Sequence, residues 1–342
     1  MTAYIIRRLL ILPVIIFGVT ILIFLMLMLL SPVERATLYV SDVPRTADDI
    51  QEIIDRYGLD DPLPIQYWRW IKQVARGDFG WSKTAQRPVG EALIHYAPVS
   101  LELALWSFTP MIVIGIWLGL QAAVHHNQLV DHVARFFSII GWSFPSYVFG
   151  LLMIMIFYAE LNWLPPGRLS EWARRVVLGA DFVRYTRMNT IDALLNLRFD
   201  VLLDALRHLV LPVITLAYVS WALILRITRT STLEALRQDY VTTARSKGLQ
   251  ERTVINRHVR PNSLMPVVTV GGLVLVGWMS GVVATETVFN IRGMGWFFAT
   301  AAQNLDMISV LGFTLFNGVI LILGNLIVDI LYGFIDPRVR LE

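Results

Sequence analysis

Long runs of hydrophobic residues separated by polar segments extend from one end of the chain to the other. Six of these runs are long enough to cross a bilayer as a helix, which takes about 20 residues. They cover approximately Leu9–Leu30, Val99–Val124, Phe136–Tyr158, Leu206–Arg226, Pro266–Phe289 and Ile308–Ile335. Each must be helical, because hydrocarbon offers no hydrogen-bond partner to the backbone. The pattern predicts an all-α integral membrane protein with six transmembrane helices.

The polar segments divide the chain into four parts. They are an N-terminal transmembrane helix (residues 1–30), a small external cap (31–98), a transmembrane core (99–335) and a tail (336–342). The first apolar run exceeds the 7–15 residues of a signal-peptide core, so we expect it to be retained.

Two amphipathic helices are predicted in the cap. Thr46–Tyr57 has helical spacing with acidic residues near its start, and Gly58 follows where a helix would end. Ile65–Ala75 has a second helical pattern, and the segment Gly77-Asp78-Phe79-Gly80 then turns the chain.

The polar interruption between the fourth and fifth runs, residues 226–265, is strongly patterned. Ser231–Lys247 has helix-forming composition, and one face would carry Leu233, Leu236, Tyr240, Thr243 and Ala244. Gly248 follows, at a position where a helix end takes a positive φ. Gln250–Val259 fits a second short helix that ends near Pro261. The pattern predicts a helix–glycine–helix hairpin outside the membrane.

Composition supports the membrane interpretation and excludes several other classes of protein. The chain has 342 residues, of which 56% are hydrophobic and only 16% charged. Its formal net charge of +3 gives little support to nucleic-acid binding. The absence of cysteine excludes disulfides, thiolate metal sites and cysteine nucleophiles. The six histidines show no compact metal-binding spacing.

The basic residues predict the orientation. Six crossings place both termini and the 226–265 loop on one side. That side carries Arg7, Arg8, Arg226, Arg229, Arg237, Arg245, Lys247, Arg252, Arg257, Arg260, Arg338 and Arg340. The positive-inside rule makes it cytoplasmic. The segment after the third run opposes this assignment, because it carries six arginines on the expected outer side, together with six acids.

One stretch of the loop has a specific resemblance. Residues 239–269 read D-Y-V-T-T-A-R-S-K-G-L-Q-E-R-T-V-I-N-R-H-V-R-P-N-S-L-M-P-V-V-T. They resemble the cytoplasmic EAA loop of type I ABC-importer permeases, most closely in the dipeptide/oligopeptide/nickel branch. Ala244 and Gly248 match the small residues of that motif, whereas Thr242 and Thr243 stand where the general motif has glutamate and alanine.

The resemblance extends to both ends of the chain. Segments 56–60 (R-Y-G-L-D) and 77–82 (G-D-F-G-W-S) are similar to the external region of peptide permeases. Segments 286–289 (E-T-V-F) and 293–295 (G-M-G) are similar to the part that follows the fifth helix, although Arg292 replaces the usual proline. The closing D-P-R-V-R of residues 336–340 is also typical.

The resemblance implies a bacterial or archaeal cytoplasmic-membrane permease that forms half of a translocation pathway. The implied partners are a second, homologous permease subunit, two ATP-binding subunits and an external substrate-binding protein. We expect no cofactor on this chain, which lacks a P-loop, so ATP and Mg²⁺ would bind the partner ATPases. The residues expected to couple to them are Asp239, Tyr240, Thr243, Ala244, Arg245, Lys247, Gly248, Arg257 and His258.

Other interpretations remain open at this stage. The cargo of similar permeases is a peptide, an oligosaccharide or nickel. The basic loop alone would also fit a surface that binds anionic lipid. A secondary transporter would need titratable groups near mid-membrane. Glu102, Glu286 and Asp329 are the carboxylates nearest the runs; the first two are expected at the membrane boundary, and Asp329 is expected to serve structure together with Asn325.

Overall fold

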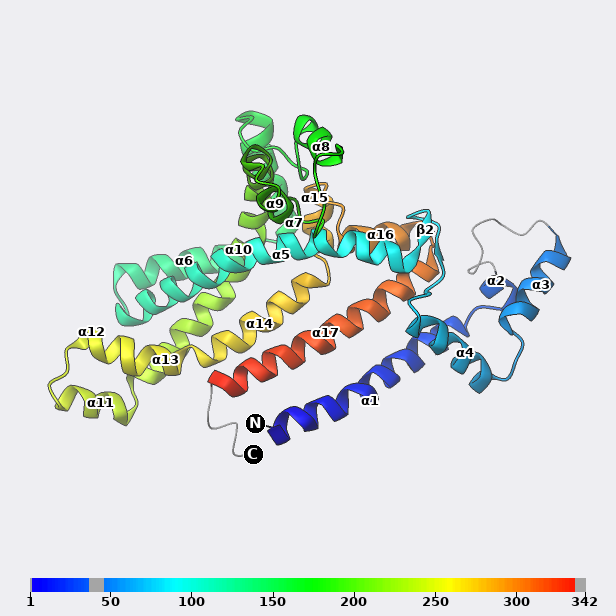
Figure 1. The fold of residues 1–342 in the computed structure, drawn as a ribbon. Coiled ribbons are helices and arrows are strands. Elements are labelled where there is room, and N and C mark those ends of the chain that lie inside the picture. The colour runs from blue at the N-terminus through cyan, green and yellow to red at the C-terminus, as the bar shows by residue number, and fades with distance from the viewer. Residues whose placement is uncertain (1, 37–45, 336–342) are drawn as a thin grey trace. The chain divides into compact units, whose positions relative to one another are not determined.

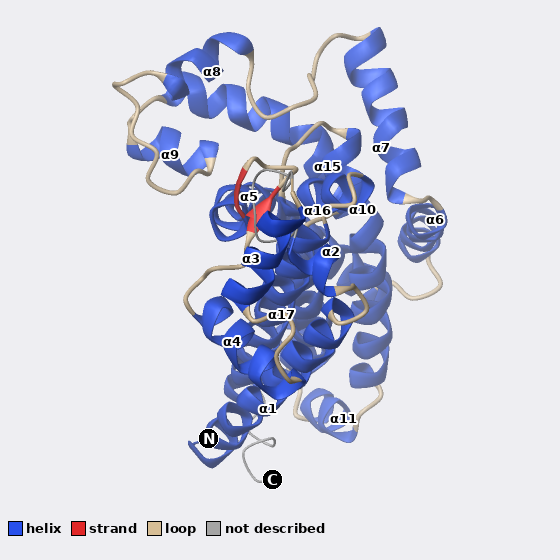
Figure 2. Ribbon diagram, turned by 90° about the vertical axis from the view of Figure 1, so that its right-hand side faces the viewer, coloured by secondary structure: helices blue, strands red, loops and turns tan. Residues whose placement is uncertain are grey.

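The computed structural model describes residues 2–36 and 46–335, in which helices joined by loops are the main secondary structure, together with one short β-hairpin (Figures 1 and 2). In this part of the chain the strands are β1 (Trp81–Ser82) and β2 (Arg87–Pro88), which pair antiparallel. The tail of residues 336–342, with Arg338 and Arg340, lies outside the described residues, and so does the side chain of Asp329. The predicted all-α fold class is confirmed.

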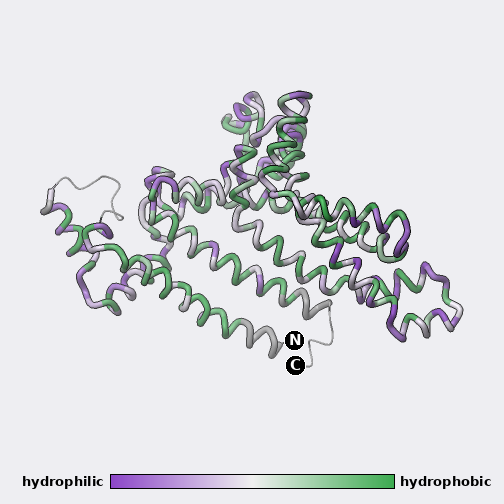
Figure 3. Tube along the Cα trace, turned by 180° about the vertical axis from the view of Figure 1, so that it is seen from behind, coloured by the Kyte–Doolittle hydropathy of each residue, from purple (hydrophilic) through white to green (hydrophobic). Residues whose placement is uncertain are grey.

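Among the described residues, four helices are long and apolar enough to span a membrane unaided. They include Leu9–Leu27 of α1 (Thr2–Leu27), α5 (Val89–Val124), α10 (Phe199–Leu236) and Met307–Val328 of α17 (Met307–Ile335). Two pairs of helices, each bent at a short break, raise the number of candidate spans to six if each pair counts as one span. These pairs are Leu129–Ser143 with Ser146–Glu160, and Glu251–Ser263 with Met265–Met279. Hydrophobic residues line these long helices, as Figure 3 shows.

The third and fifth predicted spans are not single helices, and that part of the prediction is wrong. The third divides into α6 (Leu129–Ser143) and a segment of α7 (Ser146–Ile154) with the π-helix η1 (Met155–Glu160), bent by 99°. Phe144 adopts an extended conformation because the following residue, Pro145, disfavours helical backbone before it. The fifth divides into α14 (Met265–Met279) and α15 (Val283–Val288).

One compact unit comprises Met1–Ser100, Ser280–Val283 and Arg292–Leu323. Besides α1 and parts of α5 and α17 it contains α2 (Pro32–Ala36), α3 (Ala47–Tyr57), α4 (Leu63–Ala75) and α16 (Met294–Gln303). The two predicted cap helices are confirmed as α3 and α4. Thr46 and Asp49 form a capping box that starts α3, and Gly58 ends it with a φ of 62°.

Asp306 fixes the β-hairpin within this unit. Its carboxylate accepts hydrogen bonds from the hydroxyl of Ser82 (3.0 Å), the backbone N–H of Thr84 (2.9 Å) and the hydroxyl of Ser309 (2.7 Å). Burial raises the pKa of Asp306, but these hydrogen bonds outweigh it, so the pKa lies below its ordinary value. The charged form therefore stabilises the folded state.

The second compact unit comprises Leu101–Met279, Ala284–Ile291 and Gly324–Glu342. In it α10 packs against α6, α7, α9 (Asn189–Leu195) and α14, and its first turns also contact α8 (Glu171–Leu178). The residues of α8, α9 and the start of α10 share a small apolar core of Val177, Phe182, Ala193 and Val201. Much of α10 is thus buried by its neighbours.

Close backbone contact joins α5 to α10. A Cβ atom on Gly115 would lie 2.7 Å from Cγ2 of Ile224, and one on Gly119 would lie 2.6 Å from Cβ of Thr228. The small-xxx-small face at these two glycines is therefore a helix–helix contact. The similar spacing of Gly277 and Gly281 is not, because no atom lies within 4 Å of a Cβ on Gly277.

Asp306→Asn tests the anchor of the β-hairpin. At neutral pH the free energy of unfolding of the variant should be lower by about 1–3 kcal/mol, because the buried donors lose a charged acceptor. The folded-state pKa of Asp306 is depressed, so its stabilisation is present above the unfolded pKa of about 3.9 and is lost as the pH falls through the folded pKa. Unfolding midpoints of both proteins should therefore converge on acidification; a difference that stays constant would contradict the assignment.

Gly119→Leu tests the α5–α10 contact. The added side chain would overlap Thr228 and the carbonyl oxygen of Leu225, and overpacking of this kind costs about 1–3 kcal/mol. Gly277→Leu is the matched control, since its Cβ meets open space. Thermal unfolding in lipid should separate the two variants. Equal stability of both would show that the close contact is absent.

Candidate functional site

The candidate site is the hairpin, residues 239–260, that follows α10. Helix α10 ends at Leu236, Gln238 is extended, and α11 (Asp239–Ser246) begins the first arm. The second arm contains α12 (Glu251–Thr253) and the π-helix η2 (Val254–Val259), and continues into α13 (Arg260–Ser263). Hydrophilic residues gather in this hairpin, in contrast to the long helices (Figure 3). The predicted helix–glycine–helix arrangement is confirmed.

A small apolar core holds the two arms together. Val241 and Ala244 of α11 pack with Val254 and Val259 of η2 and with Ala235 at the end of α10. The exposed fraction of every one of these side chains is at most 6%. Since this core is contained within the hairpin and its root, the hairpin does not need a partner chain to bury its apolar residues.

Gly248 makes the turn between the arms. Its φ of 77° lies in the left-handed region, where glycine avoids the steric penalty of a side chain. The N–H of Gly248 donates to the carbonyl of Arg245 (2.9 Å), and the N–H of Leu249 donates to the carbonyl of Ala244 (3.4 Å). These two bonds form a Schellman motif, which satisfies carbonyls at the end of α11.

The predicted extents of the two helices need correction. Ser231–Lys247 is not one helix, because α10 and α11 are separated at Arg237 and Gln238. The predicted face from Leu233 to Ala244 is consequently not continuous: Tyr240 and Thr243 are exposed whereas Ala244 is buried. The second helix also passes Pro261, which lies in the first turn of α13, where a missing N–H costs little.

The charged residues of the hairpin differ in what they contact. Arg245 donates from Nε and Nη2 to the two carboxylate oxygens of Glu251, at 3.0 and 2.5 Å. These hydrogen bonds raise the pKa of Arg245 above its ordinary value. Arg245 therefore links the two arms. Lys247 and Arg257 are exposed, and His258 is half-buried, with its backbone carbonyl accepting from Asn262.

The remaining predicted residues lie on the outer surface of α11. Asp239, Tyr240 and Thr243 are exposed, and the hydroxyl of Thr243 donates to the carbonyl of Asp239 (2.9 Å). The side chain of Tyr240 is 39% exposed and that of Leu249 is 41% exposed. We define the outer face of the hairpin as Asp239, Tyr240, Thr243, Lys247, Gly248 and Leu249.

The root of the hairpin is fixed to α6. Arg229 of α10 donates from Nε and Nη2 to the fully buried carboxylate of Asp131, at 2.7 and 2.8 Å. Arg226 lies over the ring of Trp142 at 4.8 Å. These two arginines were counted with the loop charges at the sequence level, but they belong to α10 and anchor it.

Sequence reasoning missed two contributors to the hairpin. Leu249 and Glu251 were not singled out, although the positions after a helix-ending glycine frequently contact that helix. The carboxylate of Glu102, which was expected at the membrane boundary, is buried within the protein and accepts from Thr190 N–H (2.7 Å) and from Arg168 (2.7 Å). Among the described residues no group of three or more His, Cys, Asp or Glu could hold a metal.

The fold and the hairpin are those of a membrane permease. Residues 111–341 match the family model "Binding-protein-dependent transport system inner membrane component", and residues 1–104 match the N-terminal model of the same systems. The chain belongs to this family, which supplies the membrane component of ABC importers, and it is a multi-pass transport component.

Individual relatives extend the similarity over nearly the full chain. It is 39% identical to the probable D,D-dipeptide transport system permease protein DdpB of Escherichia coli (strain K12), over 91% of this chain and 89% of that protein. It is 38% identical to the di/tripeptide transport system permease protein DppB of Pseudomonas aeruginosa (strain UCBPP-PA14), over 99% of each. The oligopeptide transport system permease protein AppB of Bacillus subtilis (strain 168) is 34% identical, over 99% and 100%.

Ala244→Leu should open the hairpin core. Ala244 is 5% exposed between Val241, Val254 and Val259, so a larger side chain forces the arms apart at a cost of about 1–3 kcal/mol. Thr243→Leu is the control, because the neighbouring position is exposed. Amide hydrogen exchange across residues 239–260 should accelerate in the first variant and stay unchanged in the second. Unchanged exchange in both would exclude the proposed core.

Proposed function

We propose that this chain is the permease of an ABC importer for short peptides and that the outer face of the hairpin receives the motion of the partner ATPases. The observation that carries the coupling role is the self-contained core of Val241, Ala244, Val254 and Val259. Because the hairpin is folded without a partner, its exposed residues are free to form an interface. A rigid hairpin would transmit a displacement of the ATPases to the membrane helices, whereas a flexible loop would not.

The cargo follows from the relatives. The three described above are named as permeases for D,D-dipeptides, for di- and tripeptides and for oligopeptides. Their common cargo class supports peptides over oligosaccharides or nickel for this chain. Selection of a particular peptide would belong to an external binding protein.

The outer face favours a partner surface of mixed character. Tyr240 and Leu249 offer exposed apolar area, and Lys247 offers a cation that is not paired with an acid among the described residues. An apolar cleft on the ATPase with an acidic rim would complement them. Arg245 is less available to a partner, because its Nε and Nη2 already donate to the carboxylate of Glu251. ATP and Mg²⁺ would bind the ATPases.

The proposed orientation places both termini and the hairpin in the cytoplasm. Two of the arginines expected on the opposite side are paired with acids in the structure. Arg168 is paired with the buried Glu102 at 2.7 Å, and Arg198 with Asp200 at 2.7 Å. A second, homologous permease would supply the other half of the pathway, and two ATPases would dock beneath the pair.

Gly248→Arg tests coupling. Apart from the adjoining residues, no atom of the described part of the chain lies within 4 Å of a Cβ at Gly248, so the added side chain would project from the outer face toward a docked partner. Uptake of a labelled dipeptide by cells should fall at least about tenfold, which corresponds to roughly 1.4 kcal/mol, with membrane insertion unchanged. Co-purification of the ATPase measures docking directly.

Gly248→Asn is the matched variant, since asparagine tolerates a positive φ better than other side chains and adds little bulk. It should retain most uptake. Normal uptake by Gly248→Arg would contradict the docking role, and equal loss in both variants would assign the effect to the turn rather than to the interface.

A further inference from the structure

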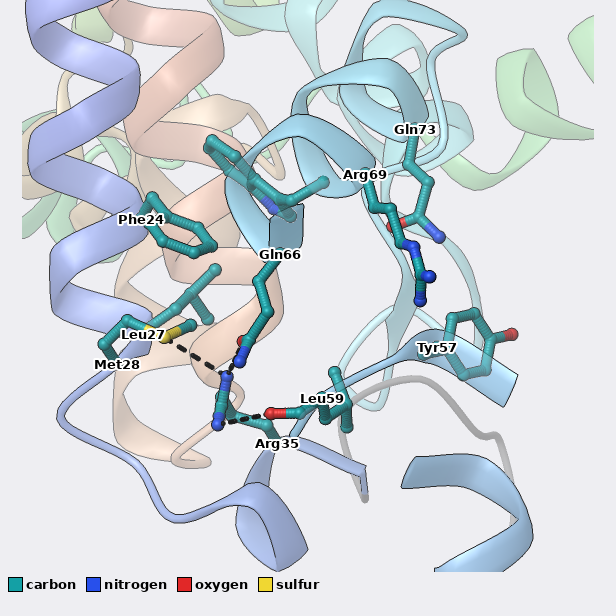
Figure 4. A pocket seen from close by; sticks show the side chains of 10 residues that line it. Phe24, Leu27, Met28, Arg35, Tyr57, Leu59, Gln66, Arg69 and Gln73 are labelled. Carbon is teal, nitrogen blue, oxygen red and sulfur yellow. Dashed lines mark hydrogen bonds between the residues drawn. The ribbon is translucent and has the colours of Figure 1, made fainter. Parts of the chain in front are cut away.

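Arg35 is a buried cation in the cap that has no acidic partner among the described residues. Its side chain belongs to α2, and the residue is only 7% exposed. Nη1 donates to Oε1 of Gln66 at 2.5 Å and lies 3.2 Å from the sulfur of Met28, and Nη2 donates to the carbonyl of Leu59 at 3.0 Å (Figure 4). All three acceptors are neutral, so the positive charge is not compensated by them.

One donor of the same guanidinium is also unused. Nε of Arg35 is buried and has no hydrogen-bond acceptor in the described structure. It belongs to a residue that lines a cavity of about 20 Å³, enough for one water-sized particle. The lining combines two guanidinium groups with neutral side chains and has no carboxylate; it consists of Phe24, Leu27, Met28, Arg35, Tyr57, Leu59, Gln66, Arg69, Trp70 and Gln73.

The surroundings of Arg35 favour a counter-ion. Arginine stays protonated in proteins, so it cannot become neutral when it is buried. A buried charge without an opposite charge is strongly disfavoured. The second cation of the lining does not relieve this, because Arg69 is half-exposed and already pairs with Asp61 at 2.7 Å. The apolar walls contributed by Phe24, Leu27 and Trp70 strengthen the attraction of the site for an anion.

We propose that this cavity is a binding site for a monatomic anion such as chloride, held by the Nε–H and the charge of Arg35. With about 20 Å³ of space for water-sized particles, the cavity suits a monatomic anion better than a carboxylate or a phosphate, which have several heavy atoms. Water would accept from Nε but would leave the charge uncompensated. The bound ion would fasten the end of α1 to α2 and α4, since the lining comes from all three helices.

Thermal unfolding of the full chain in lipid nanodiscs tests the site. Sodium chloride replaces sodium gluconate at constant ionic strength, so that only the identity of the anion changes. The unfolding midpoint should rise with chloride by about 2–4 °C and then saturate, as expected for one ligand that binds the folded state. Arg35→Gln should remove the dependence on chloride. Arg76→Gln, an exposed arginine after α4 that is not part of the lining, should retain it.

Bromide diffraction on the unaltered chain supplies a second measurement that does not depend on the folding of a variant. An anomalous peak within hydrogen-bond distance of Arg35 Nε is the expected result. Peaks confined to exposed residues would mean an adventitious ion only and would overturn the proposal. Equal midpoints in chloride and gluconate, or the same chloride response in Arg35→Gln, would overturn it as well.

Discussion

The close contact between α5 and α10 determines where the hairpin is held. The backbones of the two helices approach at Gly115 and Gly119, so that α10 lies against α5 over about one helical turn. Asp131 and Arg229 then tie the same part of α10 to α6. Because α10 is fixed on two sides just before it ends, the hairpin that follows begins from a defined position. The apolar core of the hairpin continues directly from Ala235 at the end of α10.

Buried charges in this protein are paired by groups from distant segments of the chain. Glu102 on α5 is satisfied by Thr190 and Arg168, and Asp306 by Ser82, Thr84 and Ser309. Such carboxylates are costly unless they receive hydrogen bonds, so each fixes the segment that supplies its donors. Arg35 differs from them because one of its buried donors, Nε, has no acceptor among the described residues.

Features with local causes could be predicted from the sequence, whereas features with tertiary causes could not. Thr46, Asp49 and Gly58 bound α3 through contacts within a few residues, and Gly248 ends α11 in the same way. The position of Ala244 depends on tertiary contacts. Its match to the motif placed it among the residues expected to couple to the ATPases, but its side chain packs against Val254 and Val259, which are ten or more residues away. The bend at Pro145 had a local signal, since proline disfavours helix in the residue before it, and the apolar run on both sides obscured that signal.

Helix α10 connects the hairpin to the α8–α9 segment. With 38 residues, this helix is about 57 Å long at 1.5 Å per residue, which exceeds the thickness of a bilayer core. Its first turns pack with α8 and α9, and its last residue precedes the hairpin by two residues. Pro212 interrupts its hydrogen-bond ladder once, yet the helix continues through it. Under the proposed coupling role, a displacement at the outer face of the hairpin would act on one continuous helix that reaches the α8–α9 segment. The two ends of α10 would then respond independently only if the helix bends, and Pro212 is the position where bending costs least.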